Sequence, residues 1–286
     1  MAEEPFPGKL PEPDLDIAAI LEGWDYKPGE VVTRRVFDAA GRQKIQMRLA
    51  LGLIQMEVDG RPDGQRPHGA ESLLERHQER LRQYKAAHGG EEGFSLSHEE
   101  CEELREEGLI YYYRYLCLFQ LKDFARVARD TARNLRMVDF ISAHCPLEAD
   151  RLAAEQFRPY ITMMNARAVA HLALERSDVQ TAAAQVRQAI RSVRRFYRQA
   201  QREIEGLDAE ELIEASGELK ILQELLEEIQ RLPAAQSLRP QDEEKEDRDS
   251  GPTVEDLRQQ LKKAIEQEDY ERAAMLRDRI KSLQKS

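Results

Sequence analysis

The sequence has few cysteines and no long apolar run. Its three cysteines, Cys101, Cys117 and Cys145, are odd in number and form no Cys-x-x-Cys pair. A disulfide framework is therefore not expected, and the cytoplasm, a reducing compartment, is the environment they predict. No apolar stretch approaches the length of a membrane span. The acidic, proline-rich first residues lack the basic and apolar regions of a signal peptide.

The sequence also lacks the motifs that identify common enzyme classes. It contains no His-Glu-x-x-His, Gly-x-Ser-x-Gly, Gly-x-Gly-x-x-Gly or Walker pattern. His98 and Cys101 lie one helical turn apart, and His144 precedes Cys145, but a zinc site needs about four ligands with paired spacing. We therefore interpret them as surface histidines and core cysteines, and we expect no catalytic activity, no cofactor and no metal.

The sequence also has no excess of positive charge. The formal net charge is −11 over 286 residues, and an acidic chain does not favour nonspecific binding to DNA. Alanine, leucine, glutamate, glutamine and arginine dominate, which is typical of long helices. The length allows one large domain or two to three small ones.

Strand patterns occur only near the start of the chain. Residues 1–13 are expected to form a flexible arm, and residues 14–69 a small α+β unit with about three strands. Apolar residues at 15–21 predict a short helix. Trp24, the only tryptophan, is expected to anchor this unit.

The three predicted strands form an antiparallel meander. In the second, Ile45, Met47 and Leu49 alternate with Gln46 and Arg48, which indicates burial on one face only. Asp38-Ala39-Ala40-Gly41 predicts the hairpin turn before it. Flanking helices are expected to cover the apolar face. The aspartates of Asp59-Gly60-Arg61-Pro62-Asp63-Gly64 are too few for a calcium loop, so we interpret this segment as two tight turns. The predicted strands span residues 31–37, 45–49 and 51–58.

Residues 70–232 predict a helical bundle or a tetratricopeptide-like region. Ser97 and Glu100 form a capping-box pattern at the start of one helix. Two polar joints between helices, Lys122-Asp123-Phe124 and Ser177-Asp178-Val179, lie 55 residues apart. This weak repeat is similar to tetratricopeptide hairpins but lacks their 34-residue period, and a generic bundle stays an alternative. The first helix of the region has on one face Leu73, Leu74, His77, Leu81 and Tyr84.

The second half of this region is expected to contain further helices. A helix is predicted at 123–138, followed by an insertion, 137–159, with a short helix from Leu147. A basic helix from Thr181 to Gly206 and an acidic one over 209–232 then predict an antiparallel, coiled-coil-like pair with opposed charges. The arginines could instead bind nucleic acid, although we favour pairing with the acidic helix. The arginine face consists of Arg187, Arg191, Arg194, Arg195, Arg198 and Arg202.

The last two segments differ sharply in composition. Residues 233–252 combine three prolines with a run of charged residues and predict an acidic linker with too few apolar residues to fold. Residues 253–286 carry two stretches of helical apolar spacing that meet at Glu268-Asp269. They predict an antiparallel helical hairpin. A unit of this size cannot bury its own apolar stripe and needs another surface.

The terminal segment closely resembles the UVR motif. The matching residues are the spaced leucines of its first helix, Ala264-Ile265, Glu268-Asp269-Tyr270-Glu271, Ala273-Ala274, Leu276-Arg277-Asp278 and Ile280. The motif occurs at the C-terminus of UvrB, inside UvrC, and in Clp-type chaperone ATPases and their regulators. There it is a protein-docking hairpin without catalytic function, which is what the resemblance implies here. Helicase, P-loop and nuclease signatures are absent, so the chain resembles neither UvrB nor UvrC as a whole.

These patterns favour a non-enzymatic adaptor of bacterial type. Its partner would be UvrB or UvrC in nucleotide excision repair, a Clp-type ATPase in stress response and protein quality control, or a second copy of the chain. A nucleic-acid-binding protein that uses the arginine face, residues 187–202, is the alternative. The expected partner contacts are made by Leu257, Leu261, Ile265, Tyr270, Ala273, Ala274, Leu276, Arg277, Asp278 and Ile280.

Overall fold

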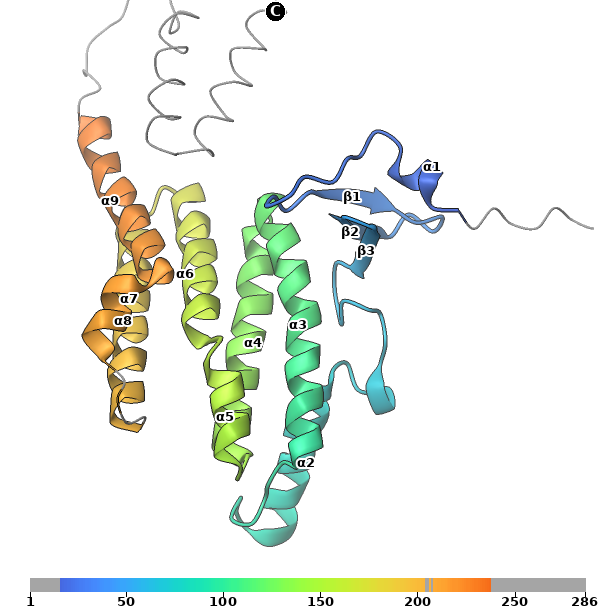
Figure 1. Ribbon diagram of the computed structural model, residues 1–286, viewed down its shortest axis with the longest axis vertical. Helices are drawn as coiled ribbons and strands as arrows, with labels where there is room; N and C mark the ends of the chain where they lie inside the picture. Colours follow the sequence, from blue (N-terminus) through green and yellow to red (C-terminus); the bar gives the residue numbers. More distant parts are fainter. Residues whose placement is uncertain (1–15, 204–205, 207, 238–286) are drawn as a thin grey trace, which may run out of the picture. The chain divides into compact units, whose positions relative to one another are not determined.

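The structure, a computed structural model, describes residues 16–203, 206 and 208–237 (Figure 1). The chain divides into two compact units, residues 1–236 and 237–286. The described part is mainly helical with one small sheet, as predicted, whereas the predicted C-terminal hairpin lies outside it. The elements are α1 (Ala18–Leu21), β1 (Thr33–Phe37), β2 (Gln43–Leu49), β3 (Gly52–Glu57), α2 (Leu73–His88), α3 (His98–Gln120), α4 (Phe124–His144), α5 (Glu148–Glu155), α6 (Arg158–Glu175), α7 (Val179–Glu203), α8 (Ala209–Ala215) and α9 (Gly217–Ser237).

The sheet is the predicted antiparallel meander, in the order β1-β2-β3. The turn before β2 is closed by the Asp38 amide, which donates to the Arg42 carbonyl at 3.0 Å. Gly41 in this turn has φ 75°, a conformation that glycine adopts without strain. On one face, Ile45 and Met47 belong to the same core cluster as Tyr115 of α3. A flanking helix therefore covers this face, as predicted.

The other face of the sheet is covered as well, so the prediction that β2 is buried on one face only is wrong. Gln46 is 6% exposed. The guanidinium of Arg34 lies 3.9 Å from the ring centre of Trp24, and its Nε donates to Gln46 Oε1 at 2.8 Å. Arg48 Nε donates to the Trp24 carbonyl at 2.9 Å. Trp24 thus anchors the N-terminal unit, as expected, and it does so through arginines.

The long helices α3, α4, α6 and α7 lie side by side in chain order (Figure 1). One core cluster runs from the sheet through α3 and α6 to α7 and α9, and a second joins α2 to the start of α3 and the end of α4. The Ser97–Glu100 capping box is present at the start of α3. None of the helices in the described ranges combines the length and apolarity needed to cross a membrane.

The two predicted polar joints share one backbone conformation. Lys122 and Ser177 have φ 57° and 59°. The amides of Asp123 and Asp178, which follow them, donate to the carbonyls of Leu118 and Ala173 at 2.9 Å each. Each joint thus ends one helix with a left-handed residue. Each aspartate carboxylate then accepts from a backbone amide of the next helix, at Arg126 and Thr181. The two joints therefore have the same local structure.

The predicted helix end at residue 138 is wrong. α4 continues from Phe124 to His144, because Val138 and Ile141 keep the apolar spacing and are buried. Residues 137–144 are therefore part of this helix, and only the short helix α5 within the proposed insertion agrees with prediction. The helix ends at His144, and the next residue, Cys145, has an extended backbone before Pro146, as the residue before a proline usually has.

The predicted acidic helix at 209–232 is two helices. Ser216 has extended backbone, φ −62° and ψ 117°, between α8 and α9. Its hydroxyl accepts a hydrogen bond from the Leu219 amide at 3.2 Å and so begins α9. The serine side chain competes with the helix for backbone hydrogen bonds, which explains the break. α9 then continues through Pro233 to Ser237, beyond the predicted end at Leu232.

Candidate functional site

The predicted docking residues, Leu257 to Ile280, all lie outside the residues that the structure describes. The structure therefore locates candidate sites on the helical body alone. Three groups of side chains stand out there: the arginine face of α7, a pocket between α2 and α3, and a set of ion pairs that joins the segment after β3 to α4.

The arginine face is the solvent side of α7. Arg187, Arg191 and Arg195 are exposed, and Arg194 is half-buried. The opposite side of the helix is the buried one, with Val186 and Val193 in the core. A helix places residues three and four apart on one face, so six arginines of this spacing form one basic surface.

The arginine face forms few ion pairs with the neighbouring acidic helices. Arg198 Nε lies 3.1 Å from Glu210 Oε1, and both side chains are more than half exposed. Between residues within the described ranges, no other ion pair joins an arginine of α7 to α8 or α9. The predicted opposition of charges is thus present as one surface pair, and such pairs contribute little stability.

A shallow hollow of about 700 Å³ lies among these arginines. Arg194 Nε is buried beside it and has no hydrogen-bond partner in the described part of the chain. Several guanidinium groups around one hollow are suited to an anion with many oxygen atoms, because each presents a planar fork of donors. The hollow is lined by Arg191, Arg194, Arg195, Arg198, Gln199 and Arg202.

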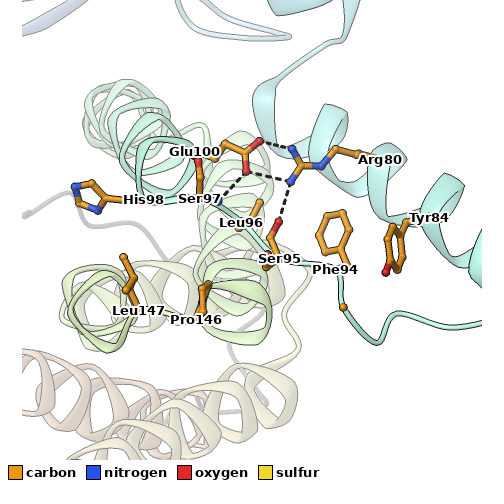
Figure 2. Close-up of a pocket in the computed structure, with 11 residues that line it drawn as sticks. Arg80, Tyr84, Phe94, Ser95, Leu96, Ser97, His98, Glu100, Pro146 and Leu147 are labelled. Carbon is orange, nitrogen blue, oxygen red and sulfur yellow. Dashed lines mark hydrogen bonds and ion pairs between the residues drawn. The ribbon is translucent and has the colours of Figure 1, made fainter.

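The second site is a pocket of about 640 Å³ at the junction of α2, α3 and the α4–α5 connection (Figure 2). Arg80 of α2 reaches across it, donates to the Ser95 carbonyl at 3.2 Å and pairs with Glu100. Glu100 also accepts from the Ser97 amide at 2.9 Å, as the partner in the capping box of α3. Arg80 and Glu100 thus bind each other in this pocket and hold α3 against α2.

The remaining wall of the pocket is apolar. Phe94 packs edge-on against Tyr84 and Phe140, and the Arg80 guanidinium lies 5.0 Å from its ring centre. Leu147, about half exposed, lines the mouth. In the described residues, no serine or cysteine that lines this pocket is hydrogen-bonded to a histidine ring. This wall thus offers aromatic and aliphatic surface for packing.

The third group fixes the segment after β3, which is predicted to form two tight turns. Gly60 and Gly64 there have φ 68° and 73°. Asp59 accepts hydrogen bonds from Arg126 and Arg129 of α4, and the bond from Arg126 contributes most to a pKa of about 2 for this carboxyl. Asp63 pairs with Arg61. Arginines thus pair with both carboxylates.

One arrangement was not predicted from the sequence. Cys101, Cys145 and Asp150 bring their sulfur and carboxylate atoms within 4.8 Å of one another, and all three residues are buried. The prediction of core cysteines and a surface histidine is correct for Cys101, Cys145 and His98. Their proximity has no sequence signal, because 44 residues separate the two cysteines and no paired spacing marks the site.

Comparison with known families gives one match. Residues 253–286 match the UvrB/uvrC motif, the UVR family, as the resemblance of this segment predicts. No curated protein and no solved structure matches the chain.

Proposed function

We propose that this chain is a non-enzymatic adaptor that docks on a partner protein through residues 253–286. The observation that carries the proposal is the match of this segment to the UVR motif, which serves protein interactions in UvrB, UvrC and Clp-type systems. The match covers residues 253–286, which follow the last helix of the described body. A cytoplasmic location is part of the proposal.

A linked arrangement has a physical advantage. A body and a docking segment on one chain make the second binding event intramolecular, which raises the effective concentration of one binding partner near the other. The part of the predicted linker that follows α9, residues 238–252, would supply the reach. The body would hold one partner, and residues 253–286 would bind UvrB, UvrC or a Clp-type ATPase, or a second copy of the chain.

The first test compares the full chain with a chain that ends at Pro252, each used to capture proteins from the native lysate and read by mass spectrometry. We expect UvrB, UvrC or a Clp-type ATPase to be retained by the full chain alone. Capture of the same proteins by both forms would show that residues 253–286 are not the docking segment. Sedimentation of both forms would then test self-association.

The second test places charges in the predicted contact stripe. Leu261→Asp combined with Ala274→Asp should weaken binding of the captured partner at least about a hundredfold, because two carboxylates would be buried without partners. Gln259→Asp with Met275→Asp is the matched control, since it adds the same charge outside the stripe. Calorimetry measures both affinities, and circular dichroism checks that the body stays folded. Equal affinities for the two double variants would refute the assigned stripe.

Binding of nucleic acid to the arginine face is a second candidate function. It is favoured by the hollow among exposed arginines that face solvent, and the acidic net charge opposes it. Each phosphate contact lowers the logarithm of affinity by about 0.9 per tenfold rise in salt. Arg191→Ala and Arg195→Ala should therefore each reduce the salt slope for duplex DNA by about one, measured by fluorescence anisotropy. Arg231→Ala, an exposed arginine of α9, is the control. Equal slopes in all variants would exclude this function.

A further inference from the structure

The cluster formed by Cys101, Cys145 and Asp150 joins three elements. Cys101 lies in the first turn of α3, Cys145 ends α4, and Asp150 lies in the first turn of α5. Cys145 Sγ is 3.7 Å from Asp150 Oδ2 and also 3.7 Å from the Leu147 carbonyl oxygen. The exposed fractions of the three residues are 0%, 4% and 3%. The donor atoms therefore meet in a place that is closed to bulk solvent.

The separation between Cys145 and Asp150 fits two ligands of a tetrahedral divalent cation. Zinc binds thiolate sulfur at about 2.3 Å and carboxylate oxygen at about 2.0–2.2 Å, so two such ligands are about 3.5 Å apart. The Cys145–Asp150 distance, 3.7 Å, is close to this value. All three donor atoms lie within 4.8 Å of one another, so a cation bound to all three would require the wider separations to shorten toward this value.

Asp150 is already held in position by two neighbouring side chains. His98 Nδ1 lies 2.9 Å from each carboxylate oxygen, and Arg105 Nη1 donates to Oδ1 at 3.2 Å. Partners of this kind orient the ligands of metal sites in proteins. The charges also balance: two thiolates and one carboxylate carry three negative charges, and zinc with Arg105 carries three positive ones.

We propose that Cys101, Cys145 and Asp150 bind one zinc ion, or a similar thiophilic divalent cation, with a water molecule as the fourth ligand. On binding, the two thiols lose their protons to solvent and the sulfur atoms form bonds to the metal.

The site would hold the start of α3, the end of α4 and the start of α5 together. The same region carries the pocket of Figure 2, which His98, Pro146 and Leu147 help to line. A bound cation would therefore fix the shape of that pocket. This inference is independent of the adaptor function, and its failure would leave the docking proposal unchanged.

The test uses the full chain, reduced and stripped of metal, with zinc alone and then cobalt alone as probes. Competition with a chromophoric chelator gives the zinc affinity and stoichiometry, and the thiolate-to-cobalt charge-transfer absorption reports sulfur ligation. Cys101→Ser and Cys145→Ser remove one ligand each. Cys117→Ser is the matched control, because Cys117 is a buried cysteine of α3 that belongs to the other core cluster.

We expect one equivalent of zinc in the natural chain and in Cys117→Ser, and a loss of affinity beyond about a hundredfold in Cys101→Ser and Cys145→Ser. Zinc at a hundredfold excess over Kd should raise the Tm of the natural chain by about 5–10 °C. The measurement on the natural chain needs no variant to fold. Absence of stoichiometric zinc, a Cys101–Cys145 disulfide in place of metal binding, or full binding in both ligand variants would each overturn the proposal.

Discussion

The burial of His77 in α2 costs free energy of folding. It is 2% exposed, and neither ring nitrogen has a hydrogen-bond partner among the described residues. Burial is the main cause that lowers its pKa from 6.5 to about 4, with smaller contributions from Arg80 and Arg76 that Glu100 opposes. The histidine is thus held neutral in the fold, as its place on the predicted apolar face of this helix suggests.

This burial predicts a pH dependence of stability. The folded-state pKa lies below the unfolded value, so the unfolded chain binds the extra proton between pH 6.5 and 4. Stability should therefore fall as the pH decreases through this window, by roughly 3 kcal/mol at most. His77→Leu should remove this part of the dependence and raise stability at neutral pH by about 1–2 kcal/mol, because an unpaired buried polar group is lost.

Urea unfolding between pH 4 and 7 measures the effect. His144 and His171, whose pKa burial also lowers, remain in the variant, so the pH slope should shrink without vanishing. His88→Leu, at an exposed position of the same helix, is the control. An unchanged slope in His77→Leu would show that His77 does not titrate between the two states.

At the scale of elements, the two helix joints are the most regular feature of the body. Both place a residue other than glycine in the left-handed region, at Lys122 and Ser177, where a side chain costs about 1 kcal/mol. Both side chains are exposed. The conformation is therefore imposed by the helix pairs α3–α4 and α6–α7 and not by side-chain contacts of these two residues.

Glycine should fit these joints better. Lys122→Gly and Ser177→Gly should each stabilise the body by about 0.5–1 kcal/mol. This value already allows for the greater conformational entropy that glycine gives the unfolded chain. Lys122→Ala and Ser177→Ala, which keep the strain, should change stability by less than about 0.5 kcal/mol. Chemical denaturation measures the four variants. Destabilisation by either glycine would mean that the native side chain makes a contribution not visible in its contacts.

At the scale of the molecule, the sheet and the helical layer are joined by charges as well as by apolar packing. Arg114 of α3 pairs with Asp130 of α4 at 2.7 and 2.9 Å, and both are 1% exposed. The same guanidinium donates to the carbonyls of Glu57 and Gly60 at 3.1 and 2.7 Å. One side chain thus links the end of β3 to two helices.

Removing this link should loosen the N-terminal unit. Arg114→Met leaves Asp130 buried with only Arg129 as an ionic partner, so we expect a loss of about 3 kcal/mol, the lower end for a broken buried pair. Arg114→Met with Asp130→Leu should recover part of it, since no unpaired charge remains. Hydrogen exchange at residues 57–60 should rise in both variants. Arg126→Met, a more exposed residue, is the control and should cost under about 1 kcal/mol. Equal losses in Arg114→Met and the control would contradict this account.

Residue types and spacing were sufficient for much of the fold. The meander follows from alternation and from Gly41, the start of α3 from Ser97 and Glu100, and both joints from their aspartates. The errors have local physical causes. Arginine and tryptophan cover the second face of β2, and Ser216 interrupts the acidic helix because its hydroxyl can begin a new one. Periodicity measures apolar spacing and is insensitive to both effects.

The sequence alone identified the UVR motif, because a short motif of two amphipathic stretches is recognised from its own residues and needs no long-range information. It also determined the class of the fold and the basic surface of α7, since helical spacing fixes which residues share a face. Only the tertiary structure decided which distant residues meet. Arg114 with Asp130, and Cys101 with Cys145 and Asp150, come together because helix packing sets their separation in space, and the number of residues between them carries no record of it.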